Sequence, residues 1–132
     1  MTITLCPCGS KENFDNCCQP IIEGKIPAPT AERLMRSRYT AFTQANGEYL
    51  MKSWHADHRN VSEQKETEQW AKSVKWMKLQ IDEVESGQEA DNEGYVTFQA
   101  FFSDKGKVFK IHEKSLFYKV DGEWFYHSGV HF

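Results

Sequence analysis

The sequence predicts an α+β protein, because apolar residues first repeat at helical spacing and later fall in strand-like runs. Helical spacing is confined to residues 31–73, and four runs rich in β-branched and aromatic residues follow over residues 75–131. All four cysteines lie within the first 18 of the 132 residues, so they mark off an N-terminal segment. We expect three parts: a cysteine knuckle at 1–22, a stiff linker with two prolines at 23–29, and one α+β domain at 30–132.

About three helices are expected in the first half of the domain. Thr30 is a predicted N-cap and Gly47 a predicted stop, which delimit the first helix. Apolar spacing predicts a second, short helix, and the capping signal at Asn60–Glu63 predicts a third, mostly polar one. The expected ranges are 31–46, 48–55 and 62–73.

Four strands are expected in the second half. Asp104–Gly106 and Asp121–Gly122 have the composition of tight hairpin turns, so the strands should form an antiparallel meander in chain order. Helices that precede such a meander bury their apolar faces by packing on one face of the sheet. The expected strand ranges are 75–85, 94–102, 107–120 and 123–131.

Composition and charge argue against some classes of protein. The net charge of −3 disfavours broad non-specific binding to nucleic acid, which needs a basic surface, so no nucleic-acid partner is expected. No stretch approaches the roughly 18 consecutive apolar residues of a membrane span, and the first residues do not resemble a signal peptide. We therefore expect a cytoplasmic protein.

The clustered cysteines are the strongest chemical signal. They form two close pairs separated by eight residues, Cys6-Pro-Cys8 and Cys17-Cys18. Clustered thiols in a reducing compartment are typical of metal ligands, whereas a disulfide framework would be spread through the fold. Zn²⁺ in structural sites takes four such ligands, so we predict a closed structural zinc site formed by Cys6, Cys8, Cys17 and Cys18. The alternatives are reduced cysteines without metal and a redox-active pair, although a disulfide between neighbours would need a strained ring.

The residues around the cysteines fit this site. Pro7 fixes φ within the first pair. Gly9 allows the backbone to approach the metal, so its amide is expected to hydrogen-bond a thiolate. Lys11 and backbone N–H groups would reduce the net negative charge that four thiolates leave on one Zn²⁺.

The cysteine motif resembles the SEC-C family, named for the zinc-binding C-terminal tail of the SecA translocation ATPase. The family pattern is C-P-C-G-S, a short spacer, then C-C or C-H, and every element is present in Cys6–Ser10 with Cys17 and Cys18. Further along, the chain resembles the YchJ-like group of small bacterial SEC-C proteins at Thr30–Tyr39, Tyr49–Leu50, Ser53–His55, His112–Phe117 and Asp121–Tyr126. The resemblance covers nearly the whole chain. It implies a zinc knuckle followed by a cone-like domain similar to the nuclear-transport-factor-two-like fold, with helices packed on a curved four-stranded antiparallel sheet around a pocket.

Arg38 interrupts the apolar face of the first predicted helix. An unpaired guanidinium there would be costly, so it needs a carboxylate or several carbonyls. The apolar face of the strand at 107–120 also carries Glu113, so we hypothesise a buried, bidentate Arg38–Glu113 pair inside the cone. The candidate pocket residues are Arg38, Tyr39, Trp54, Glu113, Ser115 and Tyr126. Three interpretations remain open: an architectural network, the floor of a ligand pocket, and catalysis.

The histidines give weaker signals. His55 and His58 flank Asp57 at a helix end, which favours a surface loop over a second metal site because the sequence shows no third ligand. His127 and His131 fall on one side of the last strand and have no evident partner. No Ser-His-Asp arrangement, phosphate-binding glycine loop or dinucleotide fingerprint is present, so no catalytic residue is predicted.

Two functions remain as hypotheses. In the preferred one, the knuckle binds another protein, by analogy with the SecA tails, which resemble it and dock a chaperone partner. Lys11, Asn13 and Phe14 are its expected exposed contacts. In the alternative, the cone pocket binds or transforms a small, partly apolar molecule. The outer face of a curved sheet often pairs, so a dimer is also left open.

Overall fold

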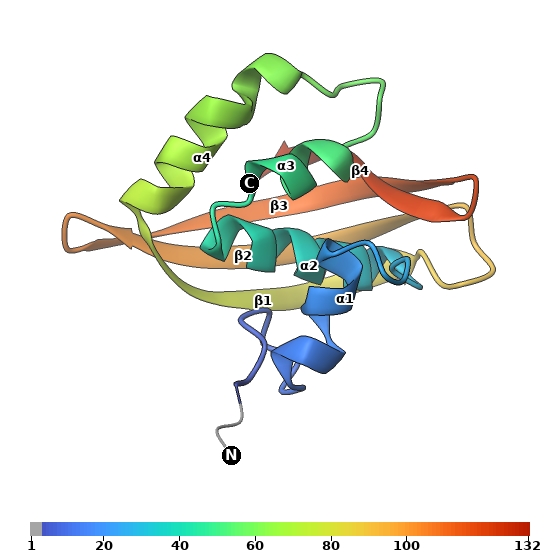
Figure 1. The fold of residues 1–132 in the computed structure, drawn as a ribbon, viewed down its shortest axis with the longest axis horizontal. Helices are drawn as coiled ribbons and strands as arrows, with labels where there is room; N and C mark the ends of the chain where they lie inside the picture. The colour runs from blue at the N-terminus through green and yellow to red at the C-terminus, as the bar shows by residue number, and fades with distance from the viewer. Residues whose placement is uncertain (1–3) are drawn as a thin grey trace.

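A four-stranded antiparallel sheet, covered on one face by helices, forms the body of the protein in the computed structural model, which describes residues 4–132 (Figure 1). The strands follow one another in space as they do in the chain, in the order β1-β2-β3-β4. The predicted α+β fold is therefore confirmed. The strands are β1 (Lys75–Ser86), β2 (Glu93–Asp104), β3 (Lys107–Val120) and β4 (Glu123–His131).

Two tight turns set the register of the meander. Lys105 and Gly106 have φ angles of 52° and 81°, and Asp121 and Gly122 have φ angles of 50° and 82°. Two successive residues with positive φ are the mark of a type I′ turn, whose twist matches that of the flanking strands. Both turns occur where the sequence predicts them.

The longest helix, α2 (Ala31–Thr43), begins as expected, because the Thr30 hydroxyl accepts a hydrogen bond from the Arg33 amide at 3.1 Å. It ends three residues earlier than predicted. The chain reverses at Ala45, which has a φ of 52°, and Gly47 begins α3 (Gly47–Lys52) instead of stopping α2. The reason is that the Asn46 side chain caps α3 by accepting a hydrogen bond from the Tyr49 amide.

The third helix on the sheet is α4 (Gln64–Ser73), which follows the short 3₁₀ helix η2 (Val61–Glu63). It covers the end of the sheet nearest the β2–β3 turn (Figure 1). Trp70 contacts Phe42, Trp76 and Phe102 edge-on or nearly so, with ring centroids 5.4–6.3 Å apart. These aromatic contacts close one side of the space between the helices and the sheet.

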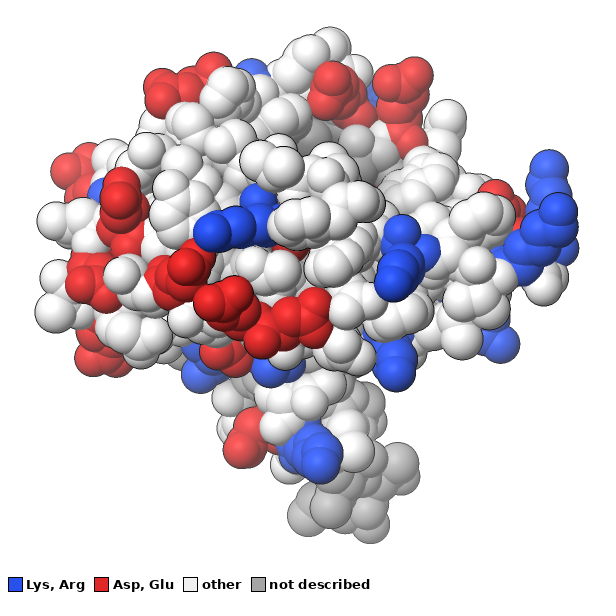
Figure 2. All heavy atoms as spheres, turned by 180° about the vertical axis from the view of Figure 1, so that it is seen from behind, with Lys and Arg blue, Asp and Glu red and all other residues white. Residues whose placement is uncertain are grey.

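The knuckle consists of η1 (Phe14–Asn16), α1 (Cys18–Ile22) and the loop before them, and it projects from the body (Figures 1 and 2). The segment predicted as a linker is not separate from the core, because Ala28 is buried in it. Ile21 of α1 is buried in the same core.

The outer face of the sheet carries acidic and basic side chains side by side (Figure 2). One pair is formed by Lys114 and Glu85, whose charged groups lie 2.8 Å apart. Met77 is also exposed, because an irregularity between Trp76 and Lys78 interrupts the alternation of β1. Over residues 4–132, no helix has both the length and the apolar character needed to cross a membrane.

Candidate metal centre and cone cavity

The four cysteines meet where the knuckle folds back on itself. Leu5 forms an isolated antiparallel bridge with Asn13, and the Cys6 amide donates to the Glu12 carbonyl at 2.8 Å. This pairing places the first two cysteines beside the start of α1, where the other two lie. The four side chains that converge are all buried and form no disulfide: Cys6, Cys8, Cys17 and Cys18.

The sulfur atoms have the spacing of ligands around one ion. Sγ of Cys17 lies 3.7 Å from Sγ of Cys8 and 3.9 Å from Sγ of Cys18, and all four sulfurs lie within 4.8 Å of one another. Four sulfurs placed tetrahedrally at about 2.3 Å from an ion are about 3.8 Å apart. The cluster therefore has the donor set and the size to hold a metal ion.

The thiols also perturb one another. Hydrogen bonds from Cys18 and Cys6 stabilise the Cys8 thiolate and lower the pKa of Cys8. The pKa of Cys18 is raised, because its own proton is held in hydrogen bonds with Cys6 and Cys8. Without a cation, ionisation of one thiol thus opposes ionisation of the next. A bound divalent cation removes this conflict because it stabilises all four thiolates together.

Polar neighbours surround the sulfurs, and two of them are hydroxyl groups. The Ser10 hydroxyl lies 3.2 Å from Sγ of Cys17, and the Thr40 hydroxyl of α2 lies 3.7 Å from Sγ of Cys6. The expectation for Gly9 was wrong: its amide donates to the Cys6 carbonyl at 3.3 Å and not to a thiolate.

Two arginines of α2 hold the knuckle against the body. The Arg36 guanidinium donates to the Cys8 carbonyl at 2.7 Å, and that of Arg33 donates to the Cys17 carbonyl at 3.4 Å. Phe14 is half-buried and packs against the cysteines. Its predicted role as an exposed contact is therefore wrong, because its ring is part of the cluster's apolar cover.

A cavity of about 260 Å³, which we call the cone cavity, lies between the helices and the concave face of the sheet. Most of its wall is apolar, but two ionisable residues that are almost fully buried, Arg38 and Glu113, also line it. The apolar wall comes chiefly from Met35, Phe42, Leu50, Met51, Trp76, Phe98, Ala100 and Ile111.

Arg38 is held mainly by neutral acceptors. Its guanidinium donates to the Leu50 carbonyl at 2.9 Å and to the Ser53 hydroxyl at 2.6 Å, both at the end of α3. It also lies over the Tyr126 ring, 4.7 Å from the centroid. Burial lowers the pKa of Arg38 to about 10.

Glu113 accepts hydrogen bonds from two side chains and lies close to a third. The Tyr126 hydroxyl donates to Oε2 at 2.9 Å, and the Ser115 hydroxyl donates to the same oxygen. His131 Nε2 lies 3.1 Å from Oε1. The pKa of Tyr126 is raised because the hydroxyl is buried and lies beside this carboxylate.

The direct Arg38–Glu113 pair expected from the sequence is not formed. No ion pair within 4.0 Å joins these two described residues; Tyr126 lies between them and contacts both. The physical reason is that α3 already offers Arg38 two oxygen acceptors, while β3 and β4 supply donors to Glu113.

The other predicted pocket residues are also brought together. Tyr39, Trp54 and Tyr126 line the cone cavity with Arg38 and Glu113. Ser115 is fully buried and reaches the cavity only through Glu113.

Two histidine contacts escaped the sequence analysis. His131 meets Glu113, and His127 lies 3.2 Å from the Asp57 carboxylate, 70 residues away in the chain. The sequence placed both histidines on one side of β4. That prediction was wrong, because a β-bulge opposite Leu116 and Phe117 puts His127 against the outer-face Tyr118, whereas His131 stays on the concave side.

Comparison with known proteins agrees with this architecture. Residues 30–129 match a family model described as the middle, NTF2-like domain of YchJ, and residues 4–20 match the SEC-C motif. The chain belongs to the YchJ-like family. The resemblance seen in the sequence is therefore confirmed.

Two relatives are similar along nearly the whole of this chain. UPF0225 protein GSU1048 from Geobacter sulfurreducens is 44% identical over 125 residues, which cover 95% of this chain and 78% of the relative. UPF0225 protein plu2503 from Photorhabdus laumondii is 43% identical over 128 residues, which cover 96% of this chain and 80% of the relative.

Two solved structures share the fold. The solution structure of RPA3114, a SEC-C motif containing protein from Rhodopseudomonas palustris, has a TM-score of 0.87 and 27% identity, and the match covers 96% of this chain and 98% of that one. The crystal structure of a SEC-C motif containing protein from Psychrobacter arcticus has a TM-score of 0.81 and 28% identity, with 96% and 81% covered. The SEC-C motif and the NTF2-like domain thus occur together in this chain, and the four cysteines could hold a metal.

Proposed function

We propose that this YchJ-like protein binds a small, mainly apolar molecule in its cone cavity, and that a structural zinc ion holds its knuckle on α2. The observation that supports the binding function most is the burial of Arg38 and Glu113 in the wall of one largely apolar cavity. Burying an ionised group costs several kcal/mol unless it is paired and hydrogen-bonded. A purely architectural core has no need of two such groups facing the same empty space.

Zinc is the ion that the cysteine cluster fits best. Four thiolates form a soft, tetrahedral donor set, and they leave no coordination position for water or substrate. The contacts of Arg36 and Arg33 with carbonyls of the ligating residues would then orient the site from outside. The free thiols also fit a reducing compartment such as the cytoplasm.

The contacts inside the cone cavity suggest the chemistry of the ligand. Glu113 is an acceptor at the floor, and His131, whose side chain is 68% exposed, contacts the same carboxylate from the mouth. The remaining wall is apolar and aromatic. The ligand would therefore have a compact apolar body of about the size of a substituted ring and one hydroxyl or amide donor for Glu113.

Ligand-detected NMR with a matched set of compounds tests this function. Phenols and cyclic alcohols are expected to bind the zinc-loaded protein, whereas hydrocarbons of the same shape should bind at least about 10-fold more weakly because they cannot satisfy Glu113. Glu113→Gln should reduce the difference between the two sets. Val130→Ala, an exposed change on the neighbouring strand β4, is the control.

Equal affinity for both sets of compounds, or a preference that Glu113→Gln leaves unchanged, would contradict a cone-cavity ligand. Ala100→Leu provides a second check, because its added methyl groups fill the cavity. It should abolish binding while the circular dichroism of the folded protein is kept.

A second candidate function is docking of the knuckle to another protein. It is favoured by the projection of the knuckle from the body (Figures 1 and 2). The exposure of Lys11, Glu12, Asp15 and Asn16 also favours it. This function would be supported if wild type captures a partner protein and Lys11→Ala does not. Lys65→Ala, an exposed change on α4, is the control and should still capture the partner. Zinc content must be equal in the three proteins. Phe14→Ala is unsuitable, because it would uncover the cysteines.

A further inference from the structure

We propose that His55, Asp57 and His127 form a second site, which binds one divalent transition-metal ion at the edge of β4. These residues lie apart from the cysteine cluster and outside the cone cavity. Within the part of the chain that the structure describes, they are the other group whose ligand atoms lie within 4.8 Å of one another. Two histidines and one carboxylate are a common ligand set for zinc and divalent iron.

Backbone pairing explains why the two histidines meet. The segment after α3 pairs in parallel with the edge of β4 through a bridge between Trp54 and Tyr126. The His55 amide donates to the Tyr126 carbonyl at 2.7 Å, which locks the register. Because His55 and His127 each follow a bridge residue, their side chains lie next to each other, with ring centroids 5.1 Å apart.

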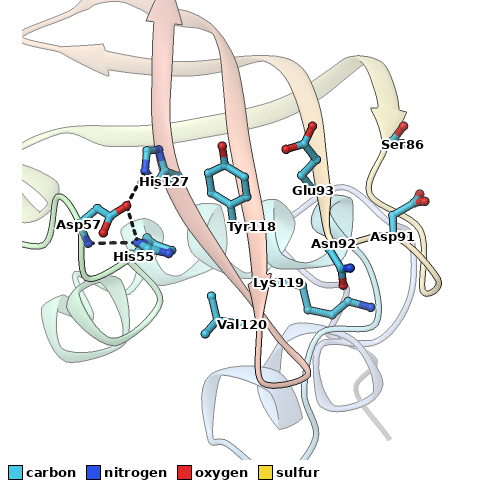
Figure 3. Close-up of a pocket in the computed structure, with 10 residues that line it drawn as sticks. All are labelled: His55, Asp57, Ser86, Asp91, Asn92, Glu93, Tyr118, Lys119, Val120 and His127. Carbon is cyan, nitrogen blue, oxygen red and sulfur yellow. Dashed lines mark hydrogen bonds and ion pairs between the residues drawn. The ribbon is translucent and has the colours of Figure 1, made fainter.

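A tight turn brings Asp57 over the two rings. The amides of His58 and Arg59 both donate to the His55 carbonyl, at 3.1 and 3.0 Å. This turn places Oδ2 of Asp57 3.2 Å from Nε2 of His127 and 3.6 Å from Nδ1 of His55, as Figure 3 shows. Ligand atoms bonded at about 2.1 Å to one metal ion are about 3.0–3.4 Å apart, so the three groups are close to ligating positions.

The surroundings hold the imidazoles in place. Nδ1 of His127 lies 2.9 Å from the Ser128 hydroxyl, an outer partner that leaves Nε2 for the ion. The His127 ring also lies edge-on to Tyr118, and the His55 ring lies edge-on to Phe125. At His55, Nδ1 accepts the Asp57 amide at 3.0 Å, and a metal bound there takes the place of that hydrogen bond.

The site faces solvent on one side. The side chains of His55 and His127 are 17% and 16% exposed, whereas Asp57 is 66% exposed. The three residues line one end of an open hollow of about 670 Å³, with Asp91 and Glu93 toward its other end (Figure 3). Three protein ligands leave coordination positions free toward this hollow, so the site is suited to an exchangeable ion and an added oxygen ligand rather than to a structural ion.

Calorimetric titration of tag-free, zinc-loaded protein with Ni²⁺ tests the proposal. Wild type is expected to bind one Ni²⁺ per chain while retaining the zinc in the cysteine cluster, as measured by elemental analysis. His127→Ala and the milder Asp57→Asn should weaken this binding at least about 30-fold, because the first removes a ligand and the second removes the negative charge of a ligand. Asp57 is exposed, so its substitution leaves the core intact.

Two further histidine variants act as controls. His112→Ala removes a histidine that also lies 3.6 Å from a carboxylate, that of Asp82. This pair does not belong to either group of possible metal ligands. His58→Ala removes a ring that lies edge-on to His127 and is not part of the ligand set. Both should bind Ni²⁺ within about 3-fold of wild type. Absence of saturable Ni²⁺ binding to wild type would overturn the proposal, as would equal affinity in His127→Ala, Asp57→Asn and His112→Ala. The three residues would then only connect the loop after α3 to β4 by hydrogen bonds.

Discussion

The carboxylate of Glu113 on β3 fills the space that a side chain at Gly129 on β4 would occupy. The two residues are close neighbours in the sheet, and a Cβ built at Gly129 would collide with Oε2, Cδ and Cγ of Glu113. A small residue is therefore required beside the buried acid. This requirement depends on the β-bulge in β4, which sets which residues face the cone cavity.

Gly129→Ala is expected to destabilise the protein by about 1–3 kcal/mol, because the added methyl group overpacks a filled site. It should also displace Glu113 and weaken its hydrogen bond with Tyr126. Urea denaturation measures the loss. Val130→Ala, on the exposed side of the same strand, should change the free energy of unfolding by less than about 0.5 kcal/mol. If the collision is the cause, adding Glu113→Ala to Gly129→Ala will give a smaller loss than the sum of the two.

Arg38→Met should lower the free energy of unfolding by about 2–4 kcal/mol. The substitution keeps apolar volume but leaves the Leu50 carbonyl without its charged donor inside the core. The matched control is Arg59→Met, because Arg59 also donates to a backbone carbonyl, that of Trp54, but does so at the surface. Its effect should stay below about 1 kcal/mol. Equal losses in the two variants would show that the burial of Arg38 has no special energetic role.

Stability should fall at alkaline pH in a way that depends on Tyr126. Burial and the neighbouring Glu113 raise the pKa of Tyr126, so the folded protein keeps this proton where the unfolded chain loses it. The stability that this shift contributes is complete below about pH 10, the pKa of an unfolded tyrosine, and is lost as the pH rises further. Arg38 has the opposite effect on stability as the pH rises. Its pKa in the folded state is lowered to about 10, so the folded protein releases this proton at a lower pH than the unfolded chain does.

The measurement compares the free energy of unfolding at about pH 9 and about pH 11. Tyr126→Phe should show a smaller loss over this range than wild type. Tyr95→Phe is the control, since Tyr95 lies on the other face of the sheet with its ring under the Lys114 ammonium. An unchanged slope in Tyr126→Phe would refute the assignment.

Removal of metal from the cysteine cluster should loosen the knuckle before the sheet. Without a cation, ionised thiolates of the buried cluster repel one another. The contacts of Arg33 and Arg36 with the cysteine carbonyls then remain, but the loop that carries these carbonyls is no longer fixed by a metal ion. We expect hydrogen exchange to accelerate by at least about 10-fold over residues 5–22 after chelation, while β2 and β3 remain protected. Re-addition of Zn²⁺ should restore protection. Unchanged exchange in the chelated protein would mean that the cluster is stable without an ion.

Local signals explain why so much of the fold could be predicted. The two hairpins rely on residues that tolerate positive φ, such as Gly106 and Gly122, and the strands between them repeat at a period of two. The cysteine pairs are similarly local, since only a short loop separates them. The boundary between α2 and α3 was missed because Gly47 was expected to stop the first helix. In the structure the chain reverses at Ala45, and Asn46 caps α3, which begins at Gly47.

The sites could be predicted only in part, because their geometry joins distant segments. Arg38 and Glu113 were identified as polar residues on apolar faces, which is a pattern in the sequence, but their partners depend on where α3 ends and on the β-bulge in β4. His127 was assigned no partner, because Asp57 lies 70 residues before it and meets it only through the Trp54–Tyr126 bridge.

By itself, then, the sequence determined the order and type of the elements, the cysteine cluster and the presence of buried polar residues, because backbone preference and side-chain periodicity act over a few residues. Only the tertiary structure decided that Tyr126 separates Arg38 from Glu113, that Phe14 covers the cysteines and that two histidines meet one aspartate. These outcomes depend on packing and strand register, in which a one-residue bulge moves a side chain from one face of the sheet to the other.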